Sequence, residues 1–155
     1  LRKEDPDMYV VAFVMNEEEI DMAYKQPYVM VGSDCGFVEQ AGHPRGAGTF
    51  PRILGYYVRE RKVMSLMDAL KKMTLLPAQR VHLTHKGEVK EGYDADLVIF
   101  DENTIIDRAT FEEPTLPPEG ISYVLLNGEV AVRNNEIVNG RLGTYIPYAP
   151  AAKRG

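Results

Sequence analysis

The pattern of apolar residues changes character near residue 86, and this change limits the folds open to the chain. Before it, several short stretches have apolar residues at helical spacing, and two apolar runs are typical of buried strands. After it, β-rich runs alternate with turn residues, and no further helix is indicated. The sequence therefore predicts an α/β half over residues 1–85 and an all-β half over residues 86–155.

The first half begins with one predicted βαβ unit. Residues 8–14 and 28–31 are apolar without alternation, which is typical of strands buried on both faces. Between them, Asn16 is a predicted helix N-cap, and Pro27 prevents the helix from continuing. Residues 36–48 are rich in glycine, and their length favours a functional loop over a simple connector.

Three further helices are predicted before the change in pattern. The first begins at Thr49, which places Pro51 in its first turn, where a missing N–H group costs nothing. Two short helices follow in tandem, starting at Ser65 and Thr74.

The second half is predicted to be built of short strands. The predicted strands are residues 88–90, 95–100, 121–126, 129–133 and 136–138. Asn127-Gly128 indicates a type I′ hairpin, because both central positions of that turn need a positive φ angle. Asn134-Asn135 is a second predicted turn.

Composition and charge argue against several classes of partner and binding site. With 18 basic against 23 acidic residues and a net charge of −5, the chain has no general attraction to nucleic acid or to an anionic membrane surface. Its apolar runs are far too short for a transmembrane helix. The single cysteine excludes an intramolecular disulfide and a multi-cysteine zinc site, and three histidines are few for a complete metal site. We therefore expect a cytoplasmic protein that binds neither nucleic acid nor a membrane.

Asp34 is the first candidate for a functional residue. It follows a predicted buried strand and precedes the glycine-rich loop. In parallel α/β sheets ligands gather at the carboxyl ends of the strands, so an acidic residue there is a candidate site residue by position alone. Capping of a turn or of the following helix is the alternative role.

Several segments around and beyond Asp34 share their motifs with one enzyme family. They are Gly32–Asp34, His43–Arg45, Gly48–Arg52, Leu54-Gly55, Tyr57–Glu60, Lys72–Thr74, Leu76–Arg80, Lys90–Tyr93, Ala95–Asp101, Asp107–Pro114 and Gly120–Gly128. Together they resemble the carboxy-terminal portion of N-acyl-D-amino-acid deacylases, the D-aminoacylase branch of the amidohydrolase superfamily. The resemblance covers nearly the whole chain, and its narrowest motifs are His43–Arg45 and Gly48–Arg52.

The resemblance implies a composite fold. Residues 1–85 would supply the last two βα units of a (β/α)8 metal-dependent hydrolase barrel, with its site loop and helices. Residues 86–155 would supply the carboxy-terminal strands of a small β-sandwich. The remaining barrel strands and the first-strand His-x-His motif do not occur in this sequence. We therefore expect a fragment of a longer enzyme that is inactive alone.

The resemblance also implies the chemistry. The intact enzyme would remove the acyl group from N-acyl-D-amino acids by cleaving a linear, non-peptide amide with Zn²⁺-activated water. Asp34 would be the general acid and base and could also touch the metal, whose other ligands lie outside this chain. Arg45 would bind the substrate carboxylate, His43 would orient the loop or approach the metal, and Met15 would line the side-chain pocket.

Two other functions stay open at the level of sequence. One is a cyclic amidase of the same superfamily, similar to dihydroorotases or hydantoinases, against which the motif His43–Arg45 argues. The other is a non-catalytic binding or assembly module that uses the β half. Whatever the function, the unpaired sheet edges of a truncated sandwich predict that the chain dimerises or aggregates.

Overall fold

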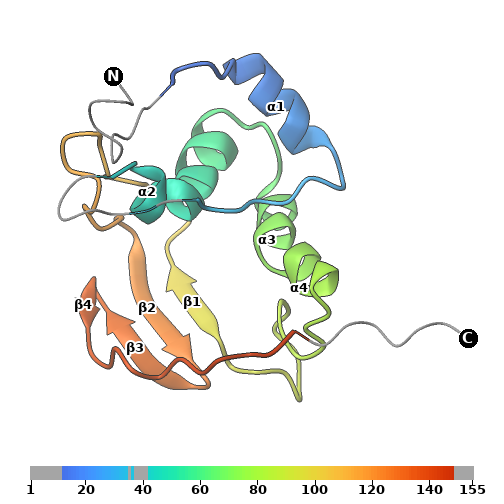
Figure 1. Ribbon diagram of the computed structural model, residues 1–155, viewed down its shortest axis with the longest axis vertical. Coiled ribbons are helices and arrows are strands. Elements are labelled where there is room, and N and C mark those ends of the chain that lie inside the picture. Colours follow the sequence, from blue (N-terminus) through green and yellow to red (C-terminus); the bar gives the residue numbers. More distant parts are fainter. Residues whose placement is uncertain (1–11, 35, 37–41, 149–155) are drawn as a thin grey trace, which may run out of the picture.

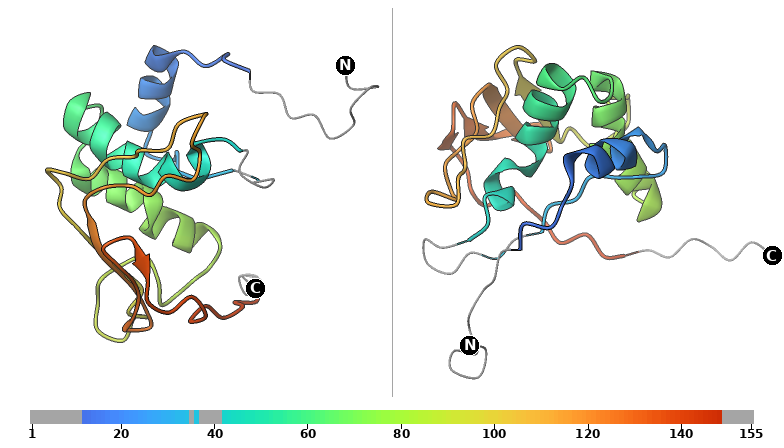
Figure 2. Two further views of the ribbon diagram at one scale, coloured as in Figure 1. Left: turned by 90° about the vertical axis from the view of Figure 1, so that its left-hand side faces the viewer. Right: turned by 90° about the horizontal axis from the view of Figure 1, so that it is seen from above.

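The computed structural model describes residues 12–34, 36 and 42–148 of the 155-residue chain. The elements are, in chain order, α1 Glu17–Lys25, α2 Arg45–Arg52, the π-helix η1 Ile53–Glu60, α3 Leu66–Met73, α4 Leu75–Arg80, β1 Leu97–Phe100, β2 Ile121–Leu126, β3 Glu129–Arg133 and β4 Glu136–Ile137. Figure 1 and the left view of Figure 2 show α2 and η1 between α1 and the sheet. No helix in these described ranges has the length and apolar character needed to cross a membrane.

The starts of α1 and α3 confirm the capping predictions. The Asn16 side chain accepts a hydrogen bond of 2.8 Å from the backbone N–H of Glu18. Ser65 Oγ accepts one of 3.1 Å from the backbone N–H of Asp68. Each bond satisfies an N–H group that the first helical turn leaves without a partner. The tandem helices α3 and α4 are confirmed as well, with Thr74 between them.

The helix predicted from Thr49 begins four residues earlier, at Arg45, so Pro51 lies inside α2 and not in its first turn. Glycine lowers helix propensity, which is why this stretch was predicted to be a loop. Packing overrides that preference here, because Gly48 is buried and a Cβ atom there would lie 3.0 Å from the Cβ of Asp107. The chain then continues directly into η1.

The β half forms one antiparallel sheet in the order β1-β2-β3-β4. The hairpin predicted at Asn127-Gly128 is confirmed, with φ angles of 50° and 82° and with Leu126 paired to Glu129. Asn134 and Asn135 form the second tight turn, with φ angles of 46° and 65°. Both turns have the positive φ angles that a type I′ connection requires.

Three predicted strands are not strands in the described residues: 12–14, 28–31 and 88–90. Residues 8–11, which complete the first of them, lie outside the described residues. A strand exists only where a neighbouring segment offers a hydrogen-bonding partner, and apolar composition alone does not supply one. Within 28–31, Val31 is buried, and its N–H group donates to the carbonyl oxygen of Lys72 on α3.

Helix α1 is held against η1 by two polar contacts. The hydroxyl of Tyr57 donates to Glu17 Oε2 at 3.3 Å, and Arg61 Nη2 lies 2.5 Å from Asp21 Oδ2. Burial, followed by the charge of Glu17, raises the pKa of Tyr57 to about 12. The hydroxyl therefore remains a hydrogen-bond donor at neutral pH. The segment before α1, with Met15, lines a cavity together with residues of α2.

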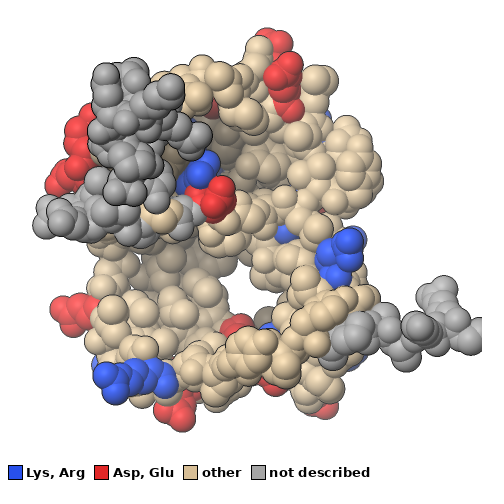
Figure 3. All heavy atoms as spheres, in the orientation of Figure 1, with Lys and Arg blue, Asp and Glu red and all other residues tan. Residues whose placement is uncertain are grey.

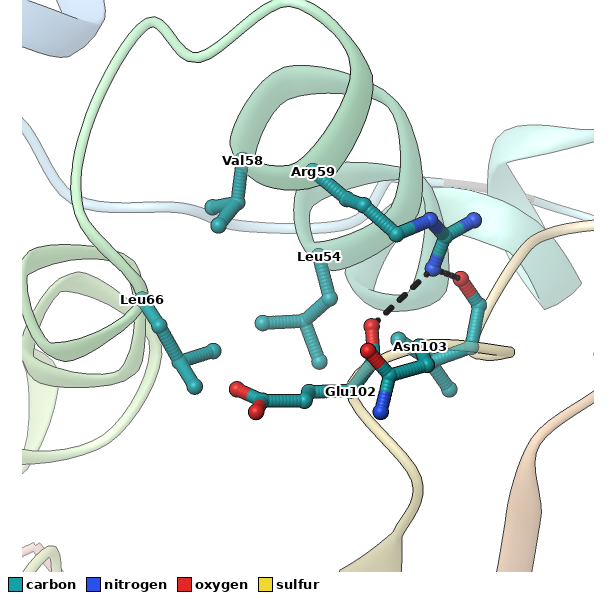
Figure 4. Close-up of a pocket in the computed structure, with 7 residues that line it drawn as sticks. Leu54, Val58, Arg59, Leu66, Glu102 and Asn103 are labelled. Atoms are coloured by element: carbon teal, nitrogen blue, oxygen red, sulfur yellow. Dashed lines mark hydrogen bonds between the residues drawn. The ribbon is translucent and has the colours of Figure 1, made fainter.

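The helical half joins the sheet where η1 packs on the turn of residues 101–106. Ile53, Leu54 and Ile105 are buried in the shared core. Arg59 Nη1 donates to the carbonyl oxygens of Ile105 at 2.6 Å and Glu102 at 3.2 Å, as Figure 4 shows. These bonds satisfy carbonyl groups beside the core, where an unpaired polar group would be costly.

Gly55 is the point of closest approach at this junction. A Cβ atom at position 55 would lie 2.5 Å from both the carbonyl oxygen of Ile105 and Cδ1 of Ile106. The backbone oxygen cannot move without displacing the whole turn. Any side chain at position 55 would therefore separate η1 from residues 101–106.

We expect Gly55→Ala to lower the free energy of unfolding of the chain by about 2 kcal/mol through overpacking. Urea denaturation followed by circular dichroism measures this change. The matched control is Gly32→Ala, because no atom lies within 4 Å of a Cβ built at Gly32. The control should change the free energy by less than about 0.5 kcal/mol. Equal losses in the two variants would contradict the proposed close approach.

Candidate functional site

Asp34 and Arg45, predicted as site residues from the sequence, are in contact. Arg45 Nη2 lies 3.3 Å from Asp34 Oδ2, and Arg45 Nε donates to the backbone carbonyl oxygen of Asp34. The Asp34 side chain is 91% exposed and that of Arg45 47% exposed. Both charged groups are therefore accessible, and each can exchange this contact for one with a small molecule at little cost.

His43 holds the backbone of the same loop. Its Nδ1 atom accepts a hydrogen bond of 3.1 Å from the N–H group of Arg45, the first residue of α2. An acceptor at Nδ1 requires the neutral ring, since both nitrogens of a protonated imidazole carry hydrogen and cannot accept. Burial, and secondarily the charge of Arg45, lowers the pKa of His43 below its ordinary value. The electrostatics and the hydrogen bond thus favour the same neutral form.

A cavity of about 550 Å³ opens beside these residues. Met15, His43 and Arg45 line it, while Asp34 is joined to it through Arg45. The lining has an apolar and a charged portion. Its residues come from α1 and the segment before it, from α2 and its preceding turn, and from residues 107–112. The structure thus brings the four predicted residues into one neighbourhood.

Sequence reasoning missed the wall formed by residues 107–112. Arg52 Nη1 lies 3.4 Å from Asp107 Oδ2, and the Asp107 side chain is only 11% exposed. Phe111 meets Phe13 edge to face at 5.3 Å between ring centroids and His43 at 5.1 Å. The segment Asp107–Pro114 was among the motifs behind the family resemblance, which was the one signal that could have indicated it.

The described residues do not form a metal site by themselves. No group of three or more histidine, cysteine or acidic residues lies close enough together among them to hold an ion. The carboxylate of Asp34 is a suitable zinc ligand by its chemistry, but a structural or catalytic zinc ion takes at least three protein ligands. Cys35 lies outside the described residues. Any metal at Asp34 would therefore need ligands from beyond the described part of this chain.

Charged side chains of both signs are mixed on one face of the molecule. Acidic and basic side chains are scattered over the face seen in Figure 3, with no gathering of basic ones. A nucleic-acid interface would need a continuous basic patch or groove. The face shown offers none.

Comparison with known proteins places the chain among amidohydrolases. Residues 22–132 match the sequence profile of the Amidohydrolase family. The chain is 43% identical over 118 residues to an N-acyl-D-glutamate deacylase and 42% identical to a D-aminoacylase, both from Alcaligenes xylosoxydans xylosoxydans. Each match covers 76% of this chain and 24% of the relative, so the chain spans about a quarter of the length of these curated relatives.

Solved structures give the same result. A D-aminoacylase with a binuclear metal centre superposes with a TM-score of 0.78 at 39% identity, covering 83% of this chain and 27% of that one. The N-acyl-D-glutamate deacylase from Bordetella bronchiseptica, complexed with zinc and a phosphonate inhibitor, superposes with a TM-score of 0.73 at 44% identity. That match covers 76% of this chain and 25% of the other. The resemblance to D-aminoacylases is therefore confirmed.

The electrostatics at His43 can be measured directly. We expect its NMR titration midpoint to lie below the ordinary value of about 6.5. Because folding depresses the pKa, any stability linked to neutral His43 is complete above the pKa of the unfolded chain and is lost as the pH falls through the folded value. Arg45→Gln should raise the midpoint only partway, since burial is the larger cause.

The matched control for that titration is Arg141→Gln, which removes an exposed arginine from the far end of the described chain. It should leave the midpoint of His43 unchanged. A midpoint that does not move, or that falls, in Arg45→Gln would show that the charge of Arg45 does not act on the ring.

Proposed function

Because the chain belongs to the Amidohydrolase family, we propose that it forms part of an enzyme that removes the acyl group from N-acyl-D-amino acids. The reaction is hydrolysis of a linear amide bond. The observation that carries this proposal is the pairing of Asp34 with Arg45 at the mouth of a partly apolar cavity. The deacylase identities of the relatives support the same reaction.

The proposed architecture follows the same comparison. Residues 1–85 are the last two βα units of a (β/α)8 barrel, and residues 86–155 are strands of a small β-sandwich. The chain's share of about a quarter of the relatives' length suits this placement. Activity then belongs to the full-length protein, meaning the longer polypeptide that includes this chain together with the rest of the barrel.

Arg45 is proposed to bind the carboxylate of the substrate. A guanidinium group offers two parallel N–H donors that match the two oxygens of a carboxylate. Its half-exposed side chain already lies against one carboxylate, that of Asp34, at 3.3 Å. The hydrogen bond between His43 and the backbone of Arg45 keeps the start of α2 in place for this contact.

Asp34 is proposed as the general base and acid. Its carboxylate accepts a proton from the water whose oxygen attacks the amide carbon, and it returns that proton to the nitrogen of the leaving amine as the C–N bond breaks. A zinc ion, when bound through ligands of the full-length protein with or without Asp34, would acidify the water and polarise the carbonyl group. The exposed side chain of Asp34 is free to meet both substrate and water.

Apolar side chains in the cavity are proposed to receive the apolar part of the substrate. Met15 lines the cavity, and its flexible thioether suits substrates of several shapes. Phe13 and Phe111 form the adjoining aromatic wall. A substrate whose carboxylate is bound at Arg45 would extend along this wall.

In the full-length protein, we expect Asp34→Asn to reduce turnover of N-acetyl-D-methionine at least about a hundredfold, because the amide cannot accept the proton. Release of the free amino acid measures turnover, and elemental analysis should find nearly unchanged metal. The control Asp94→Asn, which removes an acidic group paired with Lys86, should keep its activity. Retained activity in Asp34→Asn, or turnover only of cyclic amides, would refute the proposed reaction.

Arg45→Gln should raise the KM for N-acetyl-D-methionine by about tenfold to a hundredfold, the loss expected for a charge-assisted hydrogen bond. The same substitution should leave the KM for N-acetyl-D-methionine amide almost unchanged, because that substrate has no carboxylate. Arg141→Gln serves as the control. An equal rise for both substrates would mean that Arg45 acts on the shape of the site and not on the carboxylate.

A further inference from the structure

Lys72 is the one charged residue that is buried in the described part of the chain, with an exposed fraction of 5%. It lies in the last turn of α3. Its ammonium group donates to the carbonyl oxygen of Gln26 and, at 3.1 Å, to that of Val29. Its own carbonyl oxygen accepts a hydrogen bond of 3.1 Å from the N–H group of Val31. One residue thus makes three hydrogen bonds to one short segment, residues 26–31.

The chemistry of that segment suits a cation. Gln26 is the C-cap of α1, and the carbonyl groups at a helix end lack partners within the helix and carry partial negative charge. Pro27 follows and cannot donate a hydrogen bond. An ammonium group has three donors and no acceptor, so it can serve several carbonyl groups at once. Burying it is favourable only because these carbonyls replace water.

The segment held by Lys72 leads directly to the proposed catalytic carboxylate. Val31 is buried in the core, and only Gly32 and Ser33 separate it from Asp34. On the other side, Arg45 donates to the backbone carbonyl oxygen of Asp34. Residues 28–34 form no strand in the structure, so these contacts, and not a sheet, fix the path of the backbone.

We propose that Lys72 is a positioning residue for Asp34: by anchoring residues 26–31 to α3, it sets where the Asp34 carboxylate stands relative to Arg45. This inference rests on the proposed function. If the side chain at position 72 served only to fill space, an apolar residue would do so without the cost of burying a charge. The neighbouring Lys71 lies in the same turn of α3 and is exposed, so it supplies a control with the same chemistry and none of these contacts.

The test compares Lys72→Met, Lys72→Arg and Lys71→Met with the unaltered full-length protein. Lys72→Met should lower kcat by about a hundredfold through misplacement of Asp34, while KM changes less than about threefold because Arg45 is intact. Lys72→Arg keeps a cation with hydrogen-bond donors, so its kcat should be at least about tenfold higher than that of Lys72→Met. Lys71→Met should match the unaltered protein in every measurement.

Hydrogen exchange measured by mass spectrometry gives a readout that does not depend on activity. The amides within residues 27–34, of which Pro27 has none, should exchange at least about tenfold faster in Lys72→Met than in the unaltered protein, whereas those of α3 should not. If Lys72→Met does not fold, hydrogen exchange in the unaltered protein tests the inference instead. Slow exchange in residues 27–34 then supports the inference, and exchange as fast as in the exposed residues 88–92 overturns it.

The outcomes separate the two proposals. Loss of thermal stability in Lys72→Met with an unchanged kcat per folded molecule would overturn the positioning role, because a purely structural residue behaves in that way. A full-length unaltered protein that hydrolyses no N-acyl-D-amino acid would overturn the proposed function, and with it this inference, whatever the exchange rates show. Both proposals are supported if Lys72→Met lowers kcat and accelerates exchange in residues 27–34 while Lys72→Arg restores kcat.

Discussion

The close packing of η1 on the turn of residues 101–106 is the contact on which the rest of the structure depends. Gly55 permits this contact, and Gly120, at a φ angle of 84° just before β2, lets the same turn pack closely against the sheet. A Cβ atom at either position would lie 2.5 Å from backbone atoms of Ile105. Because η1 continues α2, this contact also sets where Arg45 stands relative to the cavity wall of residues 107–112.

The cavity is organised by two arginines that α2 presents from its two ends. Arg45, at the first residue, meets the exposed Asp34, whereas Arg52, at the last, meets the largely buried Asp107. The Arg52 guanidinium group also lies 4.5 Å from the ring centre of Tyr56. Exposed ion pairs contribute little stability and exchange partners readily, whereas partly buried ones are held. The two ends of α2 therefore suit different tasks, binding at Arg45 and wall support at Arg52.

Local signals predicted those features that depend on a few neighbouring residues. The turns at Asn127-Gly128 and Asn134-Asn135 and the caps at Asn16 and Ser65 were all predicted correctly, because each depends on short-range hydrogen bonds or φ preferences. The start of α2 was predicted wrongly, since the helix packs at Gly48 against Asp107, which is far along the chain. Within the site, Asp34 was indicated by its position before the glycine-rich loop and Arg45 by the family resemblance. The contact between Arg52 and Asp107, 55 residues apart, was not predicted, because no local signal links two residues so far apart in the chain.

The absence of strands at residues 12–14 and 28–31 has a physical consequence, because these segments leave apolar side chains exposed. Phe13 and Val14 are 82% and 78% exposed, and Tyr28 is 74% exposed, although their segments have the composition of strands buried on both faces. Such composition is unfavourable in water, because each exposed apolar side chain forgoes the free energy of burial. The proposed place in a barrel accounts for this mismatch, since neighbouring strands would supply both the missing hydrogen bonds and the covering side chains. In that proposed barrel, these exposed apolar segments would be the strands that bring Asp34 to its mouth.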